Sequence, residues 1–106
     1  SEMCIRDSAK AIITNPTHIA VAIHYEKTEV APKILVMGQG SIAQKIIEVA
    51  IANHVPVMRN PPLAQKLYRE GAIDQFIPED TYEAVAEILR WLDKLEQTTF
   101  NTEAFL

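Results

Sequence analysis

The amino-acid sequence predicts an α/β domain built on a small mixed four-stranded sheet that is flanked by helices. Three observations support this fold class. First, two short runs rich in β-branched residues flank the motif Asn-Pro-Thr-His at residues 15–18, which is a strong turn signal. Second, apolar runs at residues 33–37 and 55–58 enclose a segment with helical spacing, as in a βαβ crossover. Third, further segments with helical spacing follow from about residue 61 onward.

Residues 11–14 and 19–25 form the first two predicted strands, so the Asn-Pro-Thr-His turn lies between them. In the second run, large apolar residues alternate with small or polar ones, which indicates a sheet covered more tightly on one face. A polar loop follows at residues 26–29. Residues 33–37 are then almost entirely apolar, which is typical of a buried strand in a parallel sheet.

The first two predicted helices are bounded by recognisable end signals. Ser41 is placed to cap a helix that extends to about His54. Pro61 and Pro62 open the second helix, and Gly71 is placed to end it.

A long third helix is predicted to begin at Pro78. Its apolar residues recur at helical spacing and form a stripe suited to packing against the sheet: Tyr82, Val85, Ile88, Leu89, Leu92 and Leu95. Residues 98–106 lack a clear period, and we expect a flexible tail there.

Length, charge and cysteine content exclude several classes of protein. A chain of 106 residues makes one domain, and its net charge of -4 gives no basic footprint for nucleic acid. The longest uninterrupted apolar run, residues 19–23, is far shorter than the roughly 20 residues of a membrane-spanning helix. The single cysteine, Cys4, cannot form an internal disulfide. No histidine has compact metal-ligand spacing with Cys4; the three are His18, His24 and His54. We therefore expect no metal and no other cofactor.

The asparagine of the turn motif is followed by proline, which restricts its chemistry. Pro16 has no N–H, so the main-chain attack on the Asn15 carboxamide that causes deamidation is closed. The inverse attack remains open, in which the carboxamide nitrogen adds to the Asn15 carbonyl carbon, forms a succinimide and expels the Pro16 nitrogen. A tight turn can hold these atoms in a near-attack geometry. His18 is then a candidate proton relay, and Thr17 is a candidate donor to the oxyanion.

Taken alone, the motif does not decide between this chemistry and a plain turn. Asn-Pro turns without any reaction are the more frequent case, and His18 then has no role beyond that of a half-exposed residue at the edge of a strand.

Four segments, taken in order, resemble one known family: ITNPTHIAVAIHY, APKILVMGQG, VPVMRNPPLAQKLY and IPEDTYEAVAEILRWL. They are similar to the cytoplasmic domain of the export-switch proteins of bacterial type III secretion, the FlhB/YscU/SpaS family, from about residue 9 to residue 95. The resemblance implies a chain that cuts itself once between residues 15 and 16. Asn15, Pro16, Thr17 and His18 match the cleavage motif, and the reaction is a single intramolecular autoproteolysis without enzymatic turnover.

The resemblance also implies a place for the domain. It implies an inner-membrane component of the export apparatus whose transmembrane part lies upstream, with residues 9–97 as the autocleaving cytoplasmic domain. Residues 1–8 are interpreted as a truncated linker and residues 98–106 as the tail. Residues 69–76 and 90–92 resemble injectisome members, and hence virulence systems, more than flagellar ones.

Cleavage is expected to permit a switch from early to late export substrates, in concert with a ruler protein that reports length. The other expected partners are export-gate and ATPase-complex proteins, the secreted substrates and the chain's own cleaved N-terminal piece. A non-cleaving interaction module of the same apparatus is the first alternative.

A small nucleotide-binding βαβ domain is the second alternative, because residues 38–43 fit the pattern G-x-G-x-x-A between a strand and a helix. Arg59 and Asn60 stand where an acidic residue would hold a ribose, and the chain is too short for a second mononucleotide-binding half. Glycines that permit a tight strand-to-helix turn are the plainer explanation.

Overall fold

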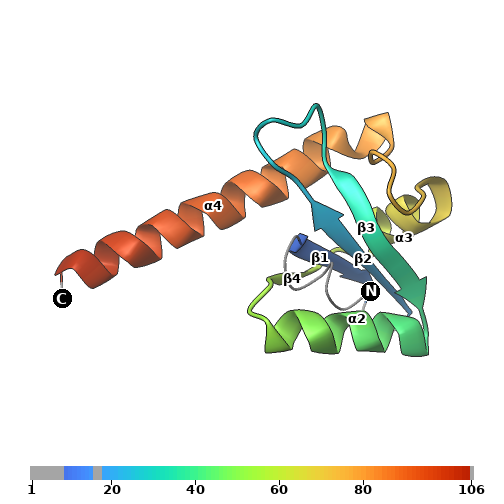
Figure 1. Cartoon of the computed structure of the whole chain (residues 1–106), viewed down its shortest axis with the longest axis horizontal. Coiled ribbons are helices and arrows are strands. Elements are labelled where there is room, and N and C mark those ends of the chain that lie inside the picture. Colours follow the sequence, from blue (N-terminus) through green and yellow to red (C-terminus); the bar gives the residue numbers. More distant parts are fainter. Residues whose placement is uncertain (1–8, 16–17, 106) are drawn as a thin grey trace.

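The described part of the chain forms one mixed sheet with helices on both faces (Figure 1). The computed structural model describes residues 9–15 and 18–105, with side chains up to residue 96. The strands lie in the order β3-β2-β1-β4 and have these bounds: β1 Ala9–Asn15, β2 Ile19–His24, β3 Lys33–Gln39 and β4 Val57–Arg59. β2 is antiparallel to β1 and β3, whereas β4 is parallel to β1. The predicted mixed four-stranded sheet, with the turn between its first two strands, is confirmed.

The position of β3 in the sheet differs from the prediction. The apolar run at residues 33–37 belongs to an edge strand that pairs antiparallel with β2, and the prediction of a buried parallel strand is wrong. The run is apolar because its side chains join the hydrophobic clusters on both faces of the sheet. Leu35 and Val36 pack on the side of α2, Ser41–Ala52, and Met37 packs on the opposite side.

Two hydrophobic clusters lie on the two faces of the sheet, and β1 contributes to both. Neighbouring residues of a strand point to opposite faces, so Ile12 enters the cluster beneath α2 and Ile13 enters the other cluster. The α2 cluster contains Ile12, Ala20, Ala22, Ala43, Ile46, Ala50 and Val55. The opposite cluster contains Ile13, Ile19, Val21, Ile23, Ile34, Leu63, Ala64, Leu67, Ile77 and Val85.

The ends of α2 differ from those predicted. Its N-cap is Gly40, without a side-chain cap hydrogen bond, so Ser41 is the first helical residue and does not cap the helix. The helix ends at Ala52, two residues before the predicted end. His54 has a φ of 60°, a left-handed conformation that a continuing α-helix does not contain.

The second helix, α3 at Pro61–Glu70, follows its sequence signals. Asn60 is the N-cap, and its side-chain oxygen accepts a hydrogen bond of 3.3 Å from the N–H of Leu63. Gly71 ends the helix in an extended conformation with a φ of −93°. A Cβ at this position would lie 2.6 Å from the Leu67 carbonyl oxygen, so the glycine allows a close approach here.

The last helix, α4 at Tyr82–Phe105, follows a single turn of 3₁₀ helix, η1, at Glu79–Thr81. The Thr81 hydroxyl donates a hydrogen bond of 2.6 Å to the Pro78 carbonyl, which fixes this start. On the outside, Lys66 of α3 contacts Asp80 at 2.6 Å, and this hydrogen bond raises the pKa of Lys66. The contact between Lys66 and Asp80 joins α3 to the turn that precedes α4.

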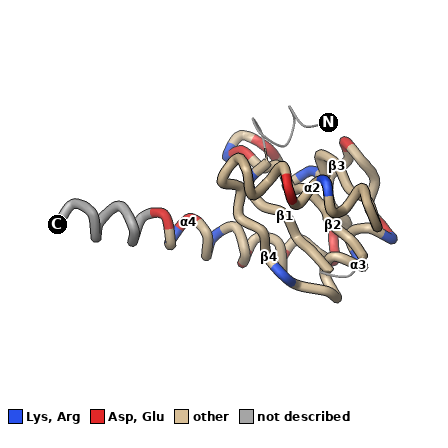
Figure 2. The backbone as a smooth tube through the Cα atoms, turned by 90° about the horizontal axis from the view of Figure 1, so that it is seen from below, with Lys and Arg blue, Asp and Glu red and all other residues tan. Residues whose placement is uncertain are grey.

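Most of α4 projects from the sheet, as Figures 1 and 2 show from two sides. Val85 in its first turns is 1% exposed, whereas Trp91 and Leu95 are 50% and 44% exposed. The predicted apolar stripe therefore packs only over its first part. The helix includes residues 98–105, although their sequence lacks a helical period, and the flexible tail stays a prediction. Over the described residues, we find no helix with the length and apolar character needed to cross a membrane.

Replacement of Val85 by alanine should destabilise the domain by about 1–3 kcal/mol, because it leaves a cavity where α4 meets the core. Replacement of Trp91 by alanine should change the free energy of unfolding by less than about 0.5 kcal/mol, because that side chain lies on the projecting part. Urea denaturation of both variants measures the difference. An equal loss in the two variants would contradict this view of α4.

Candidate functional site

The candidate site is the turn that joins β1 to β2. Asn15 is the last residue of β1 and pairs with Ile19, the first residue of β2. The main-chain N–H of His18 donates a hydrogen bond of 3.0 Å to the carbonyl oxygen of Asn15, which closes a four-residue turn. The tight turn predicted from the Asn-Pro-Thr-His motif is therefore present. Pro16 and Thr17, to which we assign the leaving nitrogen and a donor to the oxyanion, lie outside the described residues.

The hydrogen bond within the turn falls on the carbonyl group that cyclisation would attack. Attack on the Asn15 carbonyl carbon moves negative charge onto its oxygen, and a fixed N–H donor stabilises that charge. The donor here is the main chain of His18. Sequence reasoning gave His18 only a side-chain role and missed this donor. The signal was available, because a closed β-turn usually brings the N–H of its fourth residue to the carbonyl of its first.

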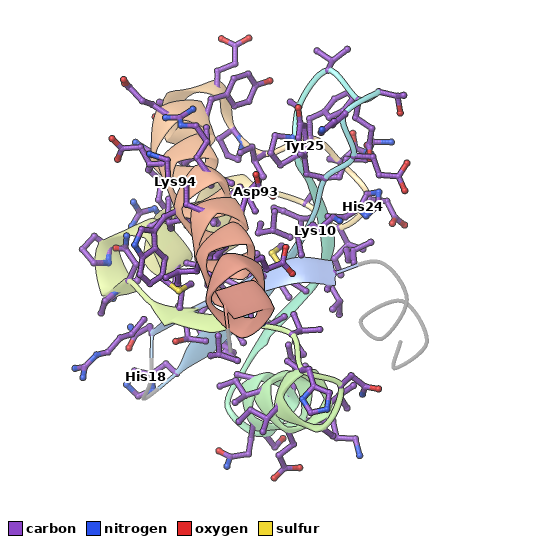
Figure 3. All side chains as sticks on the ribbon, turned by 90° about the vertical axis from the view of Figure 1, so that its left-hand side faces the viewer. Lys10, His18, His24, Tyr25, Asp93 and Lys94 are labelled. Atoms are coloured by element: carbon purple, nitrogen blue, oxygen red, sulfur yellow. The ribbon has the colours of Figure 1, made fainter. Side chains whose placement is uncertain are left out.

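The side chain of His18 is exposed and lies at the rim of the molecule in Figure 3, on the side opposite His24. An imidazole in this position is accessible to water. His24 is at the far end of β2, where it pairs with Ala9. The structure thus places the two described residues of the motif, Asn15 and His18, together. The other two histidines lie elsewhere.

The upstream end of the turn is held by β4. Thr14 is 3% exposed, and its carbonyl oxygen accepts a hydrogen bond of 3.0 Å from the N–H of Asn60. Its hydroxyl donates to the Met58 carbonyl at 3.4 Å, and on the other side Thr14 pairs with Ala20 of β2. The residue immediately before Asn15 is therefore fixed from both neighbouring strands.

The downstream end of the turn is held by the junction between β3 and α2. The carbonyl oxygen of His18 accepts a hydrogen bond of 2.9 Å from the N–H of Gly40, the N-cap of α2. Because Asn60 is the N-cap of α3, both helices begin beside the turn.

The glycines of the G-x-G-x-x-A pattern serve packing and the turn. A Cβ at Gly38 would lie 2.2 Å from Cγ2 of Ile42, so this glycine lets the strand pass close to α2. Gly40 has a φ of 61°, and its N–H already donates to the His18 carbonyl. An N–H group that a phosphate would need is thus engaged within the fold, which favours the plainer explanation of the pattern.

A second group of polar side chains lies at the other end of β2. Nε2 of His24 is 2.7 Å from Oε1 of Glu29, and the ligand atoms of these two residues and of Glu26 lie within 4.8 Å of one another. Sequence reasoning overlooked the group because it considered only histidine and cysteine spacing. The contact between His24 and Glu29 joins the end of β2 to the loop that follows it.

Comparisons with known proteins all indicate the same family. Residues 5–92 match the sequence profile of the FlhB HrpN YscU SpaS family. The flagellar biosynthetic protein FlhB of Yersinia enterocolitica is 43% identical over 90 residues, which are 84% of this chain and 24% of that protein. The hypersensitivity response secretion protein HrcU of Ralstonia nicotianae is 41% identical over 90 residues, with 82% and 24% covered. The chain thus spans about a quarter of the length of these relatives.

Solved structures of similar sequence share the fold. The cytoplasmic domain of FlhB from Shewanella putrefaciens superposes with a TM-score of 0.86 at 34% identity, covering 94% of this chain and 77% of that one. An EscU C-terminal domain in which an asparagine is replaced by alanine gives 0.80 at 32% identity, covering 84% and 89%. The sequence profile, the relatives and the shared fold agree with the resemblance seen in the sequence. The chain belongs to the FlhB, HrpN, YscU and SpaS family.

Proposed function

We propose that this chain is the self-cleaving domain of a type III secretion export component, cut once between Asn15 and Pro16 by asparagine cyclisation. The observation that carries the proposal is the hydrogen bond from the His18 N–H to the Asn15 carbonyl, within a turn held at both ends. Family membership supports it. Solved EscU domains carry replacements of an asparagine and of the proline next to it, which shows that such a pair has been a target of study in that protein.

The first step forms a bond between the carboxamide nitrogen of Asn15 and its own carbonyl carbon. The carbonyl oxygen becomes negatively charged, and the His18 N–H stabilises this charge in the tetrahedral intermediate. The nitrogen loses a proton to water or to the exposed imidazole of His18.

The second step breaks the bond between the carbonyl carbon and the nitrogen of Pro16. That nitrogen takes up a proton and leaves as a secondary amine, which becomes a new N-terminus. The upstream piece ends in a five-membered succinimide, which water opens slowly. Every group that reacts comes from the turn itself, so one chain reacts once.

Cleavage in this turn would alter a surface without removing a strand. β1 pairs with β2 along its length and with β4 over three residue pairs, and Ile12 and Ile13 are fully buried. The strand would remain in place while the turn that ends at the exposed His18 gained two free ends. A changed surface of this kind suits a switch in which export substrates are recognised.

The proposal extends to the apparatus. Like the family, the full protein would lie in the bacterial inner membrane with this domain in the cytoplasm. There it would meet export-gate and ATPase-complex proteins, a ruler protein and the secreted substrates. The flagellar and HrcU relatives are almost equally similar, at 43% and 41% identity, so the injectisome assignment rests on residues 69–76 and 90–92 alone.

Incubation of the purified chain at neutral pH should yield a fragment that begins at Pro16, and Asn15→Ala should abolish it because the nucleophile is lost. Intact-mass spectrometry over several days measures both. Thermal unfolding of Asn15→Ala provides the control and should resemble that of the parent chain, since Asn15 is only partly buried. A parent chain that stays intact would favour the non-cleaving interaction module.

Replacement of Pro16 by alanine should slow cleavage, because the turn gains other geometries. It should also open the deamidation route, since residue 16 then has an N–H. Mass spectrometry distinguishes the two products, because deamidation leaves the chain whole.

Mild alkali should speed cleavage of the parent chain by promoting deprotonation of the carboxamide. Cleavage that is independent of pH, with no deamidation in Pro16→Ala, would argue against this chemistry.

The two pieces should stay together after cleavage, because β1 keeps its pairing and its buried side chains. Size-exclusion chromatography without denaturant should give one peak that contains both pieces, and chromatography in concentrated urea should separate them. Separation of the pieces under native conditions would contradict the proposal that cleavage reshapes a surface only.

A further inference from the structure

We infer that Gly40 is a positioning residue for the cleavage reaction, and this inference rests on the proposed self-cleavage. Both polar groups of the His18 main chain are engaged. Its N–H donates to the Asn15 carbonyl at 3.0 Å, and its carbonyl accepts from the N–H of Gly40 at 2.9 Å. The Gly40 N–H therefore fixes the residue that supplies the donor to the oxyanion.

The conformation of Gly40 explains why this position needs glycine. Its φ of 61° lies in the left-handed region, where residues with a Cβ are strained. A Cβ built at Gly40 would meet no atom within 4 Å, so the surroundings have room for a side chain. A substitution would act through the backbone angle, and hence through the direction of the N–H, and not through a steric clash.

Gly40 also connects the turn to a rigid element. Its carbonyl oxygen accepts a hydrogen bond of 3.1 Å from the N–H of Gln44, in the first turn of α2. The buried face of α2 packs on the sheet through Ala43, Ile46 and Ala50. The His18 carbonyl is therefore held by an element that packs on the core, and not by a free loop.

The two ends of the turn are held in different ways. At the upstream end, Thr14 is fixed by Asn60 and by Met58 and is itself buried. At the downstream end, the exposed His18 is the last residue before β2, and Gly40 reaches it from another element. A change at Gly40 should therefore alter the donor geometry while the scissile residue stays in its strand.

The experiment compares a graded series at Gly40 with a matched glycine elsewhere. With its ψ of −128°, Gly40 lies at positive φ but outside the left-handed helical region that asparagine tolerates, so any side chain is strained there, and β-branched valine more than alanine. Gly71→Ala is the control, because a Cβ there would strain the end of α3, where the nearest atoms belong to Leu67 and Ile34 and not to the turn. Refolding of each 106-residue chain from urea starts the reaction, and intact mass gives the first-order rate.

Relative to the parent chain, cleavage should slow by about tenfold or more in Gly40→Val, and by a smaller but measurable factor in Gly40→Ala. Gly71→Ala should cleave within about twofold of the parent rate, even though urea denaturation shows it to be less stable. A parent rate in Gly40→Val, or an equal slowing in Gly71→Ala and Gly40→Ala at matched stability, would overturn the inference.

A second measurement separates this inference from the proposed cleavage and does not need valine to be tolerated. In an Asn15→Ala background, amide hydrogen exchange of His18 should be at least about tenfold faster when Gly40→Ala is added, whereas adding Gly71→Ala should leave it within about twofold. If the parent chain never cleaves, both the proposed function and the positioning role are overturned. If it cleaves but His18 exchange is unaffected by Gly40→Ala, only the positioning role is overturned.

Discussion

The structure depends on one constraint. The turn at residues 15–18 is closed by a hydrogen bond to the carbonyl of Asn15, and Asn15 ends a strand that is held within the sheet. The hydrogen bond from His18 to Asn15 holds the turn closed, and β1 lies inside the sheet between β2 and β4. Both faces of β1 are buried, through Ile12 on one side and Ile13 on the other. Packing on both faces therefore fixes the strand that ends at Asn15. In the proposed reaction, this would keep a weak nucleophile near the carbonyl carbon that it attacks.

With this arrangement, the proposed reaction would need no separate catalyst. The attacking nitrogen, the carbonyl carbon and the leaving nitrogen are consecutive along the chain, so the protein has only to supply geometry and a donor to the developing charge. Thr14, hydrogen-bonded to Asn60, fixes the upstream end of the turn. Gly40 fixes the downstream end through its hydrogen bond to His18. The same contacts explain why breakage of the chain need not unfold it, because the strand pairs that surround the turn do not use the broken bond.

Local signals in the sequence predicted much of this. Asn-Pro predicted the turn, Pro61 and Pro62 predicted a helix start, and the matching segments predicted the family. The position of β3 at the edge was missed, because an apolar run looks the same in an interior strand and in an edge strand whose side chains pack into clusters on both faces. The capping role of Ser41 was wrong, since the hydrogen bond from Gly40 to His18 places the N-cap one residue earlier. That bond joins residues distant in sequence, so local patterns cannot reveal it.

The most direct test of asparagine cyclisation is the chemical structure of the new C-terminus at Asn15. Peptide mapping of the upstream piece, soon after cleavage, should find a cyclic imide that weighs one water less than the acid. It should later find a mixture of asparagine and isoasparagine as the ring opens from both sides. A piece that ends only in ordinary asparagine with a free α-carboxylate, at all times, would show hydrolysis by another agent and would contradict the account.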